Sequence, residues 1–82
     1  MESLRKKVID IASTFFGKKI TYDTEMGDID EWDSLGHINL FMAIEEEFGK
    51  KFPPDKVIEA DSIEKIVNLL IEQQEKDADE NR

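Results

Sequence analysis

The chain has 82 residues, which is enough for one small domain with a thin core and too few for a deep catalytic cavity. It has no cysteine, which excludes a disulfide framework, a thiolate nucleophile and a cysteine-based zinc cluster. The formal net charge of -9 opposes binding to nucleic acid and favours basic partners. No apolar run has the length of a signal-peptide core or a membrane span, so we expect a cytoplasmic protein without membrane insertion.

The excess negative charge lies in one third of the sequence. Residues 21–49 contain nine of the 20 acidic residues and none of the 11 Lys and Arg residues. Elsewhere the acidic and basic residues balance. This distribution suits a docking surface for positively charged partners. An acidic surface that serves only solubility would give the same pattern.

Hydrophobic periodicity predicts an all-α fold. Apolar residues recur at helical spacing over residues 3–16, 34–48 and 62–74, which indicates three main helices. Two consecutive prolines precede a short third helix at residues 56–59. The expected architecture is therefore a four-helix bundle with three main helices, one short third helix and a long loop, residues 17–33, between helices one and two. Such a long loop is uncommon unless it is functional or packed by its own side chains.

The chain is expected to form one domain, over residues 1–74. Residues 75–82 contain one small apolar residue in eight and are expected to form a disordered acidic tail.

The apolar residues of the second main helix form two stripes, about 140° apart at 100° per residue. The aromatic-rich stripe is expected to face the core and consists of Leu40, Phe41, Ile44 and Phe48. The other stripe is expected to be exposed as an interaction surface and consists of Leu35, Ile38 and Met42. A central helix that is buried on both faces would carry the same two stripes.

The start of this helix is the candidate site. Either Asp33 or Ser34 can cap it, and the helix dipole and free backbone N–H groups there favour a phosphate on Ser34. His37 is the only histidine, but no oxyanion-hole loop accompanies it, so a serine hydrolase is not indicated and packing near the core is its expected role. The acidic run at residues 28–33 departs from an EF-hand, which needs glutamate where Asn39 stands, so no metal site is expected.

Two segments resemble the acyl carrier protein family: EWDSLGHI at residues 31–38 and AIEEEFG at residues 43–49. The resemblance extends from the first helix through the last. It implies that a magnesium-dependent phosphopantetheinyl transferase attaches phosphopantetheine from coenzyme A covalently to Ser34, while Asp33 supports the transfer by helping to place the metal. It also implies that the protein is not an enzyme and carries acyl groups as thioesters between enzymes.

The resemblance implies two further sets of residues. Residues that dock on acyl-transferring or acyl-modifying enzymes with basic patches would be Leu35, Ile38, Met42, Glu45 and Glu46. Residues that line an acyl pocket inside the bundle would be Leu40, Ile44, Phe48, Phe52, Val57, Ala60 and Ile63. Plain core packing is compatible with the second set.

The subtype follows from departures from the family pattern. Gly36 and Asn39 stand where carriers of fatty-acid synthesis often have acids, and His37 follows Gly36. This is more similar to stand-alone carriers of specialised pathways. We expect a monomeric acyl carrier protein of fatty-acid, specialised-lipid or polyketide biosynthesis. An aminoacyl, D-alanyl or peptidyl carrier and an unmodified helical interaction module stay open as alternatives.

Overall fold

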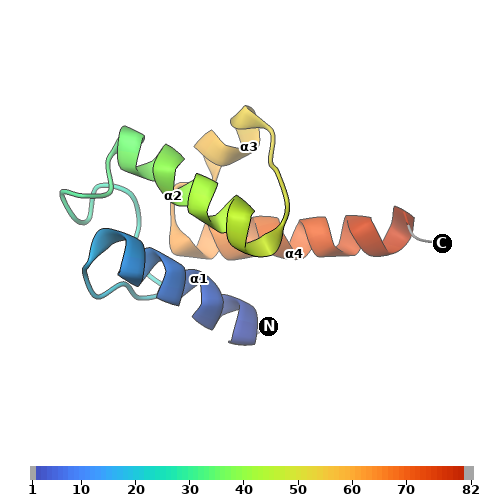
Figure 1. Cartoon of the computed structure of the whole chain (residues 1–82), viewed down its shortest axis with the longest axis horizontal. Helices are drawn as coiled ribbons and strands as arrows, with labels where there is room; N and C mark the ends of the chain where they lie inside the picture. The colour runs from blue at the N-terminus through green and yellow to red at the C-terminus, as the bar shows by residue number, and fades with distance from the viewer. Residues whose placement is uncertain (1, 81–82) are drawn as a thin grey trace.

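The structure, a computed structural model, describes the backbone of residues 2–80 and the side chains of residues 4–74. Four helices follow one another along this part of the chain: α1 (Glu2–Phe16), α2 (Ser34–Phe48), α3 (Pro54–Glu59) and α4 (Ile63–Glu80). The predicted all-α, four-helix class is confirmed, including the short third helix and the long connection between α1 and α2 (Figure 1).

The core lies where α1, α2 and α4 meet. α1 packs against both α2 and α4, and α3 lies at the edge of the bundle, beyond α2 as seen from α1 (Figure 1). None of the residues of α3 is fully buried. The largest fully buried side chains are Val8, Trp32, Leu40, Phe41, Ile44, Ile63, Ile66, Val67 and Leu70. The core is therefore built by three helices and by buried residues of the connections, namely Ile20, Trp32, Phe52 and Ala60, and α3 covers its edge.

The long loop is fixed in place by its own side chains and by the start of α4. Trp32 is fully buried. The Met26 N–H donates to the Asp61 carbonyl at 2.9 Å, and the Ile63 N–H donates to the Thr24 carbonyl at 3.0 Å. These two hydrogen bonds form an isolated antiparallel bridge. The expectation that the loop is packed is thus confirmed. The path by which its final residues lead into α2 is fixed by these contacts.

Glycine ends α1 and α2, and a serine caps α4. Gly17 and Gly49 have φ angles of 66° and 65°, the left-handed conformation that glycine adopts at helix C-termini without steric cost. At the start of α4 the Ser62 hydroxyl accepts the Lys65 N–H at 3.2 Å, so Ser62 is the cap.

The C-terminal end of α4 differs from the prediction. We expected the helix to end at Gln74, but the backbone of residues 75–80 continues the helix to Glu80. Residues 81–82 lie outside the described residues. The physical reason is that this segment has no Gly or Pro and contains Glu, Lys and Ala, which are strong helix formers. A helix that is already nucleated by its packed part extends through such residues at little cost. Within residues 2–80, no helix combines the length and apolar character needed to cross a membrane.

Candidate functional site

Asp33 caps α2. Its backbone is extended, with φ -106° and ψ -167°, and its Oδ1 accepts the Gly36 N–H at 2.8 Å. The Asp33 carbonyl accepts the first intrahelical hydrogen bond, from the His37 N–H at 2.8 Å. Of the two possible caps, Asp33 is therefore the one used. Ser34 is the first residue of the helix and is exposed, and its hydroxyl takes no part in capping.

The start of α2 suits a phosphate. The backbone N–H groups of Ser34 and Leu35 precede the first hydrogen bond of the helix, so no carbonyl of the helix can accept from them. The positive end of the helix dipole lies at the same place. A phosphodiester on the Ser34 oxygen would lie where both features favour negative charge. These residues thus fit the phosphate of a phosphopantetheine arm.

Gly36 allows the loop to approach the helix. A Cβ at this position would collide with the Glu31 carbonyl oxygen and would lie 3.2 Å from Asp33 Oδ1. A side chain at position 36 would therefore push the loop away from α2. From the sequence we interpreted the missing acid at this position as a mark of subtype, whereas the structure gives it a steric reason.

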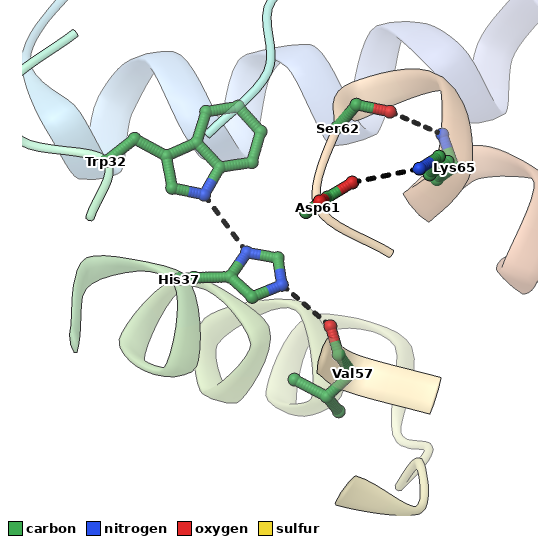
Figure 2. A network of polar contacts seen from close by, with 6 residues as sticks. All are labelled: Trp32, His37, Val57, Asp61, Ser62 and Lys65. Carbon is green, nitrogen blue, oxygen red and sulfur yellow. Dashed lines mark hydrogen bonds and ion pairs between the residues drawn. The ribbon is translucent and has the colours of Figure 1, made fainter. Parts of the chain in front are cut away.

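His37 is buried, with 4% of its surface exposed, and the expectation that it packs near the core is confirmed. Its Nδ1 accepts the Trp32 indole N–H at 3.0 Å, and its Nε2 lies 2.7 Å from the Val57 carbonyl oxygen (Figure 2). Because an indole N–H can only donate, Nδ1 carries no proton in this arrangement. The proton of the neutral ring is then on Nε2, which donates to Val57.

The two faces of α2 differ as predicted. Leu40 and Ile44 are fully buried, and Phe41 is 2% exposed. On the opposite face the exposed fractions are 68% for Leu35, 52% for Ile38 and 59% for Met42. The alternative of a helix that is buried on both faces is therefore wrong. Phe48, which was predicted to face the core, is only partly buried, since it is the last residue of the helix.

Ile58 of α3 belongs to the same exposed apolar surface and was missed in the sequence. It is 71% exposed, and it lines a groove of about 260 Å³ between α2 and α3. The residues that line this groove are Ile38, Phe41, Met42, Glu45, Phe52, Pro54, Val57 and Ile58. The available signal was the pair Val57-Ile58 in a short helix, where two adjacent residues cannot both face inward.

Of the two predicted acidic docking residues, one has a structural contact. Glu45 is partly buried, and its Oε2 accepts the Phe52 N–H at 2.9 Å, which holds the connection between α2 and α3. Glu46 is exposed. Only Glu46 therefore presents a carboxylate that is free of such a contact. Among the side chains of residues 4–74, no group of three His, Asp or Glu residues is placed to hold a metal ion.

The predicted acyl-pocket residues lie in or against the core. Leu40, Ile44 and Ile63 are fully buried. Phe52 and Ala60 are 7% and 4% exposed. Phe48 and Val57 pack against this core from its edge. The set is thus continuous with ordinary core packing, and two of its members, Phe52 and Val57, also line the α2–α3 groove.

The part of the chain that forms this fold and this site matches a known family. A sequence model described as the phosphopantetheine attachment site matches residues 6–70, which extend from α1 into α4. No curated protein sequence matches the chain with significance. The chain belongs to the phosphopantetheine attachment site family and is a carrier protein of the acyl carrier protein type. Its cofactor is a covalently attached phosphopantetheine.

Proposed function

We propose that Ser34 is the residue that carries the phosphopantetheine and that the chain transports acyl groups as thioesters on this arm. The observation that supports Ser34 is that another residue caps α2. Asp33 supplies the cap, so the Ser34 hydroxyl is exposed and is not needed to satisfy the helix. A serine that caps its own helix would have to give up that hydrogen bond when modified.

In the attachment the Ser34 oxygen forms a bond to the phosphorus that carries the pantetheine, the pyrophosphate link of coenzyme A breaks, adenosine 3′,5′-bisphosphate leaves, and the transferase takes up the serine proton. Asp33 uses Oδ1 for the cap, which leaves Oδ2 to help place the magnesium ion of the transferase. We assign no catalytic group to the chain itself. Its contribution is a helix terminus that favours the negative phosphate and holds the arm at a fixed point.

Partner enzymes are proposed to bind the exposed face of α2. Leu35, Ile38 and Met42 supply apolar area that is available for burial in an interface. The surrounding segment, residues 21–49, carries the excess negative charge of the chain, which steers basic patches toward Ser34. The partners are the phosphopantetheinyl transferase and the enzymes that load, modify or unload the arm.

An acyl cargo of fatty-acid, specialised-lipid or polyketide biosynthesis fits best. The support is the groove between α2 and α3, whose lining is apolar except for Glu45. An apolar chain gains free energy from leaving water in such a groove, whereas a small charged aminoacyl group does not. We place the carrier domain at residues 1–74.

The test is the intact mass of the protein after incubation with coenzyme A and a phosphopantetheinyl transferase. The parent is expected to gain one phosphopantetheine, and Ser34→Ala is expected to gain none. Ser62→Ala is a matched control because Asp61 and Ser62 also stand as an Asp-Ser pair at a helix start. Ser62→Ala should be modified like the parent. Labelling that persists in Ser34→Ala would assign the arm to another residue.

A further inference from the structure

Burial explains only part of the position of α3, since Val57 packs against the core from its edge. This helix has six residues and no fully buried side chain, and Ile58, its fifth residue, is 71% exposed. A helix of this length is not stable by itself in water. Its place beside α2 must therefore depend on a few specific contacts with the rest of the fold.

One such contact is the hydrogen bond from His37 to the Val57 carbonyl. In a continuing helix this carbonyl would accept the N–H of residue 61. Here the Asp61 N–H donates instead to the Glu59 carbonyl, at 3.0 Å, because α3 ends at Glu59. The Val57 carbonyl is thus without its helical partner, and His37 Nε2 takes that place at 2.7 Å.

The orientation of the imidazole is set from the loop side. Trp32 donates to Nδ1, and its indole ring stacks on the imidazole with centroids 6.0 Å apart and planes 22° apart. Phe41 also contacts the imidazole, in a T-shaped arrangement with centroids 5.2 Å apart. His37 therefore has one orientation and one proton position, both suited to Val57, and Figure 2 shows the line of contacts from Trp32 through His37 to Val57.

We propose that His37 is a positioning residue that holds α3 against α2 and thereby presents Ile58 as part of the docking surface. Ile58 lines the same groove as Ile38 and Met42, so a partner that covers the exposed face of α2 also meets α3. Without the His37 hydrogen bond, no side chain of α2 donates to the backbone of the last turn of α3. The role of Ile58 in partner binding rests on the proposed function. The role of His37 in fixing the position of α3 does not.

The first arm of the test is amide hydrogen exchange of the unmodified protein. His37→Phe keeps an aromatic ring between Trp32 and Phe41 but cannot donate to Val57. The amides of Val57 in α3 and of Ala60 at its end, which donate to the Pro53 and Lys56 carbonyls, are expected to exchange about tenfold faster, the size expected for the loss of one hydrogen bond. Val8→Ala is the control, because Val8 is a fully buried residue of α1 and its truncation lowers the global stability. Equal acceleration of α3 and α4 in His37→Phe would overturn the proposal.

The second arm is a double-mutant cycle on the KM of the transferase reaction. Ile58→Ala is expected to raise KM severalfold in the parent and to have no further effect in His37→Phe, because α3 is then already displaced. Ile38→Ala is the matched control on α2, and it should raise KM by the same factor in both backgrounds. If Ile58→Ala raises KM equally in both backgrounds, His37 does not present Ile58. If Ser34 is not modified at all, the proposed function fails while the exchange measurement still decides the hold on α3.

Discussion

The carbonyl oxygen of Glu31 lies directly against the Cα of Gly36, in the space that a Cβ would occupy. This contact joins the end of the long loop to the first turn of α2, on either side of the cap residue Asp33 and of Ser34. The path of the loop and the start of the helix are thus fixed together by the absence of a side chain.

This contact predicts whether the substitution Gly36→Ala raises or lowers the stability of the protein. Helix propensity alone would make Gly36→Ala stabilising by about 1 kcal/mol. The collision with Glu31 predicts the opposite, a loss of about 1–3 kcal/mol, because the loop must shift. Urea denaturation measures the difference. Asn39→Ala is the control on the same helix, where the side chain is exposed and only propensity acts. If the Gly36→Ala protein is more stable than the parent, the loop at Glu31 can move away from α2 at little energetic cost.

Asp33 has two proposed roles, which two substitutions separate. Asp33→Ala removes the cap and should lower the stability by about 1 kcal/mol. Asp33→Asn keeps an oxygen that can accept the Gly36 N–H, so its melting temperature should stay close to that of the parent. Its rate of modification by the transferase should nevertheless fall, since it lacks the charge that helps to place magnesium. If Asp33→Asn is modified as fast as the parent, Asp33 acts only as a cap.

The two faces of α2 should respond differently to truncation. Ile44→Ala removes a fully buried side chain and should cost about 2–5 kcal/mol, a large share of the stability of so small a domain. Met42→Ala alters a side chain that is 59% exposed and should cost less than about 1 kcal/mol. Denaturant midpoints of the two variants give the comparison. Equal losses would contradict the assignment of Met42 to a docking surface.

The electrostatic part of docking is best tested at Glu46. Glu46→Lys should slow modification at low salt, and the effect should shrink as salt rises, because the Debye length is only about 8 Å at physiological ionic strength. The melting temperature should change little, since Glu46 is exposed. Glu72→Lys on α4 makes the same change of charge away from α2 and should leave the rate nearly unchanged. Equal slowing by both variants would mean that only the net charge matters.

Glu45 is expected to behave differently from its neighbour. Its carboxylate accepts the Phe52 N–H, so Glu45→Lys should lower the stability by about 1–3 kcal/mol as well as the rate of modification. Glu45→Gln keeps an acceptor and should restore most of the stability. Thermal melts of the two variants measure this difference. If Glu45→Lys melts like the parent, the contact with Phe52 contributes nothing to folding.

The four helices and the two faces of α2 could be predicted from local sequence patterns. Residues three and four apart lie on one side of a helix, so local spacing reports which residues share a face. Leu35, Ile38 and Met42 were separated in this way from Leu40 and Ile44, and the size of the apolar side chains indicated which face is buried. The candidate site at Ser34 was also found locally, from a short motif at a helix start.

Tertiary structure decided what distant segments do to one another. Gly36 is required by the path of a loop, and Glu45 holds the backbone of Phe52. His37 and Val57 are 20 residues apart, and the spacing within either helix carries no information about the hydrogen bond between them. The exposure of Ile58 beside Ile38 and Met42 was missed for the same reason, because it depends on how α3 lies on α2. Periodicity describes one helix at a time, whereas the partner of each polar group is set only when the helices pack.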